Sequence, residues 1–326
     1  YQNSELVAFM LQSIKTYARS KRAVFAKFDP SLFLRKGLIG QEVKDQETTL
    51  AIIQSLKDCG VEWVGRTEDM GETIQPRFQA NIYKEYFTED QLSKSTKQAI
   101  RTARNKGVEV IFGGTELLDE FAALMKKTEA RKGIHLRGRE YYEKLLTTYA
   151  GQSYITLSRI NLAERLTSLK EQLKKNQAEA SRFNEKTKPG KIENNRQEKE
   201  RLEEEIQFLN QELKSGQEIV SLSGTLTLEF GGTSENVYAG MDENFRRYQP
   251  AILTWYETAQ HAFDRGADWQ NMGGVENHLD GGLYHFKSKF NPMIEEFVGE
   301  FNLPTSMLYP LVNKAYQLRK KLRNKQ

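Results

Sequence analysis

Residues 280–287 read Asp-Gly-Gly-Leu-Tyr-His-Phe-Lys and belong to a block, 229–301, that is dense in glycine and aromatic residues. Glycine pairs occur at 231–232, 273–274 and 281–282. Since a glycine pair lets the backbone turn sharply or approach a ligand closely, we expect several such approaches in this block. Lys287 stands between Phe286 and Phe290, which favours a partly desolvated ammonium suited to an oxyanion or a phosphate. A glycine-rich sheet with ordinary turns would have the same composition.

Helical and strand patterns alternate along the residues that precede this block. An apolar stripe predicts a first helix: Leu6, Phe9, Met10, Ile14 and Tyr17. Because this helix follows Tyr1 at once, we expect the chain to begin inside a domain. Strands are expected at 23–28, 62–64, 77–83, 108–112 and 153–158, and helices at 48–59, 93–106, 117–132 and 139–149. The alternation predicts an α+β or α/β fold, with a mixed sheet covered by helices.

Heptad spacing is the clearest periodicity, and it occupies 160–216. Leucine or isoleucine recurs every three or four residues from Leu162 to Leu173, and again from Leu202 to Leu213, on either side of Pro189-Gly190. Two heptad seams broken by Pro-Gly predict an antiparallel helical hairpin. A strand pattern resumes at 221–230, so we expect the hairpin to be an insertion within a domain. A structural coiled coil and an arm that grips nucleic acid both fit this pattern.

Bulk composition limits the class of protein. The 326 residues are 38% hydrophobic and 28% charged, with a net charge of +4, which describes a globular protein with much exposed helix. The single cysteine, Cys59, excludes an internal disulfide framework and fits a reducing cytoplasm. Four unclustered histidines give no metal site, and we expect no cofactor. No stretch approaches the roughly 18 apolar residues that span a bilayer.

Positive charge is concentrated in two helices. In the helix expected at 93–106, four cations recur at a spacing that places them on one face: Lys94, Lys97, Arg101 and Arg104. No acid occurs in 93–108, so this face suits a phosphate-bearing ligand, although a solvated surface is the plainer interpretation.

The tail, 309–326, has no acid either, and it contains Lys314, Arg319, Lys320, Lys321 and Arg323. Leu311, Ala315, Leu318 and Leu322 line the opposite face of that expected helix. A basic amphipathic helix suits an anionic bilayer surface or an RNA backbone. A terminal helix docked on the protein, with a basic exterior, is the alternative.

Several segments together resemble the FemABX family of peptidoglycan-branching aminoacyltransferases, and within it the streptococcal MurM/MurN-type enzymes. They are Ile74-Gln75-Pro76-Arg77, the basic helix 95–107, and residues 131–142, 230–250, 273–274 and 281–301. The resemblance implies two GNAT-like (acyl-CoA N-acyltransferase-like) domains with an inserted antiparallel coiled-coil hairpin. We therefore expect a first GNAT-like domain at 1–106 that lacks its amino-terminal part, and a second at 107–159 and 217–305. The hairpin then spans 160–216, and a basic C-terminal helix spans 306–326.

The resemblance also implies a function. Such enzymes transfer an amino acid, here most simply Ala or Ser, from aminoacyl-tRNA to the stem-peptide lysine amine of lipid II in cross-bridge synthesis. The expected partners are aminoacyl-tRNA, lipid II and the inner membrane surface, with the protein cytoplasmic and peripheral to the membrane. The cations of 93–106 would then contact tRNA phosphates, and those of the tail would contact membrane or RNA.

Site residues follow from the same resemblance. Lys287 matches a lysine that stabilises the developing negative charge, for which one good donor is worth roughly 3–4 kcal/mol. Arg246, four residues before Pro250, matches an arginine that holds precursor phosphate. Substrate contact is also expected, less specifically, for Arg77, Tyr238, Asp280 and Tyr284, of which the two tyrosines could instead be packing residues.

The general base is unassigned, and other functions stay open. Residues 77–83 carry no carboxylate where some family members have a candidate base, which leaves Asp280 and Glu276. One alternative is an acetyl-CoA-dependent GNAT N-acetyltransferase, but 35–40 (Arg-Lys-Gly-Leu-Ile-Gly) has its glycines at the wrong offsets for a pyrophosphate loop. Another is a non-enzymatic RNA- or membrane-binding protein built around the hairpin.

Overall fold

The computed structural model describes the backbone of residues 3–323 and the side chains of residues 3–319. The chain forms two compact units, of which the first is Tyr1–Ser93 with Ala267–Gln326 and the second is Lys94–Gly266. The sequence-based division differs, because it ended the first domain at 106 and assigned 267–305 to the second. Residues 267–305 instead pack with the amino-terminal segment, through strand pairings that no local pattern shows.

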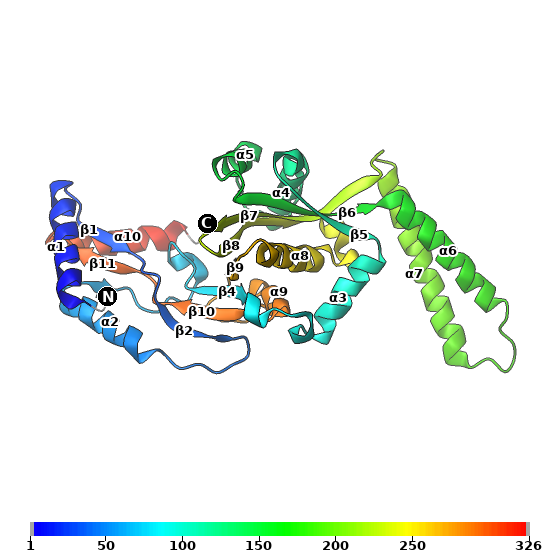
Figure 1. The fold of residues 1–326 in the computed structure, drawn as a ribbon, viewed down its shortest axis with the longest axis horizontal. Helices are drawn as coiled ribbons and strands as arrows, with labels where there is room; N and C mark the ends of the chain where they lie inside the picture. Colours follow the sequence, from blue (N-terminus) through cyan, green and yellow to red (C-terminus); the bar gives the residue numbers. More distant parts are fainter. Residues whose placement is uncertain (1–2, 324–326) are drawn as a thin grey trace. The chain divides into compact units, whose positions relative to one another are not determined.

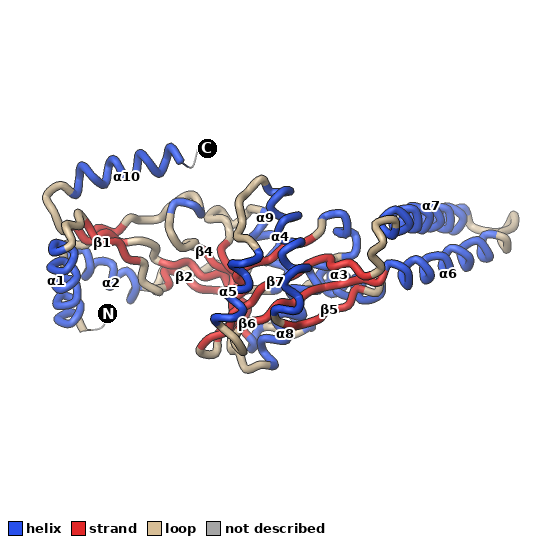
Figure 2. Tube along the Cα trace, turned by 90° about the horizontal axis from the view of Figure 1, so that it is seen from above, coloured by secondary structure: helices blue, strands red, loops and turns tan. Residues whose placement is uncertain are grey.

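The first unit contains two antiparallel sheets. Four strands follow one another in the order β2 (Phe33–Leu38), β10 (Met293–Phe297), β4 (Phe78–Tyr83) and β9 (Trp269–Gly274). A smaller sheet has the order β1 (Phe25–Phe28), β11 (Phe301–Pro304) and β3 (Glu62–Trp63). Figure 2 shows the strands of both sheets in red. Residues 23–28, 62–64 and 77–83 therefore contain strands, as the sequence predicts.

Helices α1 (Ser4–Ser20) and α2 (Glu47–Asp58) pack on the small sheet, over a core that includes Leu34, Leu56 and Phe301. The stripe predicted for the first helix is not its packing face. Phe9 and Tyr17 are exposed with the rest of that stripe, whereas Leu11 and Ala18 are the buried residues of α1. The periodicity gave the helix but not the side by which it docks.

In the second unit, helices cover both faces of an antiparallel sheet of order β8 (Thr233–Met241), β7 (Ile219–Phe230), β6 (Ser153–Asn161) and β5 (Val108–Gly113). Consecutive residues of β7 face opposite ways. A Cβ at Gly224 would lie 3.2 Å from the Phe121 ring of α4 (Leu118–Lys132). On the other face of the sheet, the hydroxyls of Thr225 and Thr258 of α8 (Pro250–Asp264) form a hydrogen bond of 3.1 Å. Figure 1 shows α4 and α8 on these two sides, with α5 (Arg139–Thr148) beside α4.

The predicted hairpin is present as α6 (Leu162–Ala180) and α7 (Pro189–Leu213), which lie side by side in Figure 1. Leu169 and Leu209 are fully buried in its seam. Further out, the Asn176 amide donates to the Asn195 carbonyl and the Asn195 amide to the Asn176 carbonyl, at 3.0 and 3.1 Å. Ile192, beyond this pair, is exposed. The apolar seam therefore ends before the tip.

The remaining helices are short or terminal: α3 (Lys94–Asn105), α9 (Gly282–Lys287) and α10 (Tyr309–Arg323). Short 3₁₀ turns occur at Met70–Glu72, Lys84–Tyr86, Glu89–Gln91, Thr115–Leu117, Glu243–Tyr248 and Ser288–Phe290. Within the described part of the chain, every helix is too short or too polar to cross a bilayer.

Candidate functional site around Lys287

Helix α9 positions Lys287, whose side chain is 5% exposed. The Nζ donates a hydrogen bond of 2.7 Å to the carbonyl oxygen of Gly274, at the end of β9. Phe286 and Phe290, on either side in sequence, pack edge to face with ring centroids 5.6 Å apart. Little of the Lys287 side chain therefore meets water, as its position between two aromatic residues predicts.

Glu276 fixes the start of α9. Its two carboxylate oxygens accept from the backbone amides of Leu283 and Tyr284, each at 3.0 Å. Burial by itself raises the pKa of Glu276, but these amides and the charge of Lys287 outweigh it and hold the pKa below its usual value. A carboxylate with a lowered pKa is a weak base, so this geometry favours a structural role over that of a general base. Asp280, the other candidate, is exposed.

Three of the four glycines at 273–274 and 281–282 would meet protein groups if they carried a Cβ. A Cβ on Gly273, whose φ is +82°, would lie 3.4 Å from the Lys287 Nζ. A Cβ on Gly274 would come within 2.6 Å of the Pro76 ring, and one on Gly281 would overlap Glu276. Gly231-Gly232 has φ values of +55° and +77° and forms the β7–β8 hairpin turn. Internal packing and turn geometry thus account for these glycines, where close approach to a ligand was also expected.

A pocket of about 340 Å³ lies in the first unit beside α9, lined by Tyr284 together with Phe78, Leu279 and Ile294. Leu279 has φ +56°, a strained conformation for a branched residue, in the turn that leads to α9. Tyr284 also packs on the cluster formed by Phe78 and Val275. Its ring therefore serves both as packing and as pocket wall.

Two buried carboxylates on β10 were not predicted. Glu296 pairs with Arg77 and Arg35, and Glu295 pairs with Lys36 at 2.7 Å. Arg77 is itself buried and also donates to the Thr67 carbonyl at 2.8 Å, so its guanidinium is engaged within the protein. Two consecutive acidic residues in a sequence usually indicate solvent exposure. These two are buried because basic residues distant in the sequence pair with them, which the local pattern does not show.

The segment 35–40 forms part of strand β2 and the turn that follows it. Its cations are the partners of Glu295 and Glu296 just described. A pyrophosphate loop would instead open a helix and present backbone amides to the ligand. The local structure of 35–40 is therefore not that of a pyrophosphate loop, in line with its glycine spacing.

Arg246 and Tyr238 both belong to the second unit but differ in exposure. The Arg246 side chain is 80% exposed, in the 3₁₀ turn before α8, and its nearest carboxylate is Glu243 at 3.3 Å. Tyr238 packs against Tyr142, with ring centroids 5.0 Å apart, at the edge of the core beneath α4. Arg246 is thus available to an anionic ligand, and Tyr238 is mainly a packing residue.

Helix α3 presents the predicted cationic face. It buries Thr96, Ile100 and Ala103 and leaves Lys94 and Arg101 exposed. Lys97 is half-buried, and Arg104 forms an ion pair of 2.6 Å with Glu257 of α8. The residues share one helix face as expected, with the charge of Arg104 partly neutralised.

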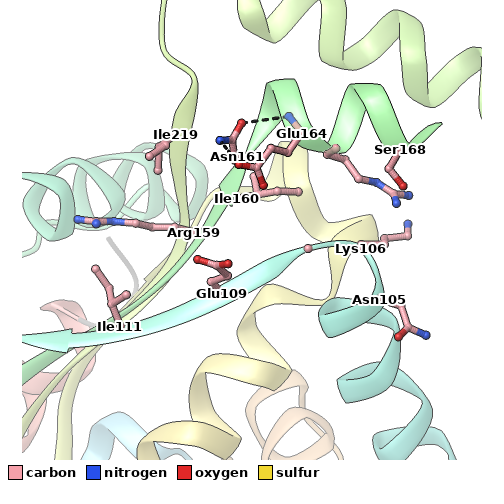
Figure 3. Close-up of a pocket in the computed structure, with 12 residues that line it drawn as sticks. Asn105, Lys106, Glu109, Ile111, Arg159, Ile160, Asn161, Glu164, Ser168 and Ile219 are labelled. Atoms are coloured by element: carbon pink, nitrogen blue, oxygen red, sulfur yellow. Dashed lines mark hydrogen bonds between the residues drawn. The ribbon is translucent and has the colours of Figure 1, made fainter. Parts of the chain in front are cut away.

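The root of the hairpin contains a second cavity, of about 410 Å³ (Figure 3). It is surrounded by the last residue of α3 and the one after it (Asn105 and Lys106), by Arg159 of β6, and by Glu164 and Ser168 of α6. Beside it Arg165 pairs with Glu205 of α7 at 2.7 Å, and both side chains are buried. Lys106 reaches Glu205 at 3.9 Å and stacks over Tyr248. This polar cluster joins the hairpin to the second unit, and the heptad pattern gave no signal for it.

Among residues 3–319, no group of three or more His, Cys, Asp or Glu side chains is placed to hold a metal ion. The expected tail contacts Lys320, Lys321 and Arg323 lie outside the described side chains. Arg319 is described and exposed.

An α+β fold with a buried lysine after a Gly-Gly strand end and an inserted helical hairpin places this chain among known proteins. Residues 1–320 match the FemAB family, so the chain belongs to that family. It is 27% identical over 342 residues to the lipid II:glycine glycyltransferase of Staphylococcus aureus strain USA300, covering 98% of this chain and 76% of that protein. A further S. aureus lipid II:glycine glycyltransferase is 26% identical, over 97% and 77% of the two chains.

The solved structure "Crystal structure of FemX" superimposes with a TM-score of 0.68 at 24% identity, covering 95% of this chain and 79% of that one. This likeness confirms the α+β fold.

Proposed function

We propose that this protein moves an amino acid from aminoacyl-tRNA to the stem-peptide lysine amine of lipid II, in the synthesis of peptidoglycan cross-bridges. It is an aminoacyltransferase, as its FemAB relatives are by name. The observation that carries the proposal is the family match over 1–320 combined with the burial of Lys287 on the Gly274 carbonyl.

The chemistry needs a charge of this kind. The amine nitrogen attacks the ester carbonyl carbon, a C–N bond forms, and the carbonyl electron pair moves onto oxygen. The oxyanion then collapses, the bond to the ribose oxygen breaks, and the amine proton leaves with that oxygen or passes to water. Lys287 would stabilise the oxyanion, and one good donor there is worth roughly 3–4 kcal/mol.

The remaining site assignments are part of the same proposal. Arg246 would hold precursor phosphate, and Lys94, Lys97, Arg101 and Arg104 would hold tRNA phosphates. Tyr284 and Asp280 would contact the acceptor. Tyr238 and Arg77, which are engaged within the protein, would support the residues that contact substrate. We propose that the protein works as a pair of GNAT-like domains at the inner face of the membrane, in the manner of MurM/MurN-type enzymes.

The identity of the amino acid that is transferred is the most specific part of the proposal. The resemblance to MurM/MurN-type enzymes favours Ala or Ser, whereas the S. aureus relatives are named for glycine. Serine differs from alanine by a hydroxyl, and an apolar pocket separates such a pair only by about a hundredfold. Competition between the three charged tRNAs is therefore the appropriate measurement.

The test incubates the full-length protein with lipid II and with alanyl-, seryl- or glycyl-tRNA, and follows the acceptor by mass spectrometry. We expect a mass gain of one residue that depends on the charged tRNA, with uncharged tRNA as the matched control. No gain with any of the three would overturn the proposal. A thermal shift with acetyl-CoA instead would support the N-acetyltransferase alternative.

A further inference from the structure

Helix α10 belongs to the first unit and packs one side against the rest of that unit, while its opposite side faces away. Tyr309 is buried, stacks edge to face on Phe25 of β1 and donates from its hydroxyl to Glu62 of β3 at 2.6 Å. Tyr316, two turns on, reaches the same Phe25 ring at 6.2 Å. These contacts fix the rotation of the helix about its axis.

The outward side is apolar. Leu311 and Leu318 are 72% and 61% exposed, and Ala315 lies between them on the same stripe. At 100° per residue this stripe lies about 180° from Tyr309. Met307 and Leu308, just before the helix, are 98% and 58% exposed and extend the stripe. One expectation from the sequence was a docked terminal helix with a basic exterior. Helix α10 is docked, but its exterior carries an apolar strip.

Cations flank the strip. Lys314 lies along one edge and Arg319 along the other, and both are exposed. From 301 to the end of the chain the sequence has no Asp or Glu, and four more cations follow Arg319: Lys320, Lys321, Arg323 and Lys325. Such a helix, apolar on one side with basic edges, is typical of helices that lie in the plane of a bilayer interface.

We propose that the outward strip of α10 (Met307, Leu308, Leu311, Ala315 and Leu318, with Lys314 and Arg319 at its edges) docks on an anionic phospholipid bilayer. The leucines enter the headgroup boundary while the cations meet lipid phosphates. RNA fits less well, because exposed aliphatic side chains gain little from a phosphate backbone, whereas a bilayer removes them from water. This surface is separate from Lys287, and the proposal does not depend on transferase activity.

The test measures binding of the full-length protein to phosphatidylcholine vesicles with and without phosphatidylglycerol, by cosedimentation. We expect binding to the anionic vesicles that weakens as salt is raised. Lys314→Gln/Arg319→Gln should weaken it by at least about tenfold, since each cation near such a surface contributes roughly fivefold. Lys174→Gln/Lys175→Gln, which removes the same charge from exposed positions of α6, should leave it unchanged.

The apolar strip has its own matched pair. Leu311→Gln/Leu318→Gln should reduce binding by at least roughly tenfold, while Leu6→Gln/Met10→Gln, on an exposed stripe of α1 where both side chains are 54% exposed, should not. All four positions are exposed, so the fold should survive, and circular dichroism checks this.

Insertion is measured directly with an environment-sensitive label. On a Cys59→Ser background, which removes the exposed native thiol, a label at Leu311→Cys should shift to the blue on anionic vesicles. A label at Ile192→Cys on the hairpin should not. Equal loss of binding in strip and control variants, no shift at position 311, or binding of α10 to tRNA in place of vesicles would overturn the proposal.

Discussion

The ammonium of Lys287 and the carbonyl oxygen of Gly274 lie 2.7 Å apart, so a helix of six residues is attached to the end of strand β9 through a buried charge. The same side chain stands 3.4 Å from the position that a Cβ on Gly273 would take. Strand end and lysine therefore constrain each other, and this contact positions the charge on which the proposed chemistry depends.

Replacing Lys287 by Met keeps most of the stem volume and removes the charge. We expect Lys287→Met to slow transfer by at least roughly tenfold, because the oxyanion loses its cationic donor. Lys289→Met, two residues along, is the matched control and should retain activity. The measurement is single-turnover transfer to lipid II, and wild-type rates in Lys287→Met would remove this lysine from the mechanism.

Gly273→Ala tests the contact from the other side. Gly273 and Gly60 share a φ of +82°, but a Cβ at Gly60 meets nothing within 4 Å. Both alanine variants should lose about 1–2 kcal/mol of stability from the left-handed backbone. Only Gly273→Ala should also slow transfer, because only its methyl group would touch the Lys287 Nζ, at 3.4 Å. Equal activity of the two variants would contradict the proposed coupling.

Glu276→Gln should destabilise the protein in a pH-dependent way. The pKa of Glu276 is lowered in the folded state, so its charge stabilises the fold above the ordinary carboxyl pKa of about 4.3. That contribution disappears as the pH falls through the lower folded-state pKa. We expect a loss of about 1 kcal/mol at neutral pH. Denaturation curves should show that the difference in unfolding free energy between Glu276→Gln and wild type becomes smaller in acid. Glu42→Gln, at an exposed carboxylate, should show no such difference.

Glu205 is predicted to be the residue most sensitive to truncation in the hairpin. Removing it leaves Arg165 buried without its carboxylate, which typically costs about 3–5 kcal/mol. We expect Glu205→Ala to lower the urea midpoint and to raise hydrogen exchange at the root of α6 and α7. Glu193→Ala breaks an exposed pair with Arg196 on the same helix and should have no measurable effect. Similar loss in both variants would argue against a structural cluster at the root.

The cationic face of α3 predicts salt-dependent tRNA binding. Lys94→Gln/Arg101→Gln should weaken binding and reduce the slope of log affinity against log salt by about 1.4–1.8. Arg104→Gln should have a smaller effect, because Glu257 already neutralises part of its charge. Filter binding across a salt series measures this, with Lys44→Gln/Lys144→Gln as the control. An unchanged slope in the α3 variant would place the tRNA elsewhere.

Local patterns gave the elements whose periodicity is visible in the sequence. Helices α2, α3 and α4 lie within one residue of their expected ranges, and α6 and α7 both fall inside the expected 160–216. One face of each helix meets solvent, so the apolar spacing shows it. Helix α8 was not predicted. It is buried on most sides, so its apolar residues follow no single stripe.

The sequence by itself determined the helical hairpin, the cationic face of α3, the family and the desolvation of Lys287, since each depends on residues that are near one another in the chain. Tertiary structure alone decided which partners the buried charges have. Glu276 became a helix cap, Glu205 a partner of Arg165 forty positions away, and Arg77 a partner of Glu296. Ion pairs of this kind are made by strands and helices distant in sequence, and no local spacing encodes them.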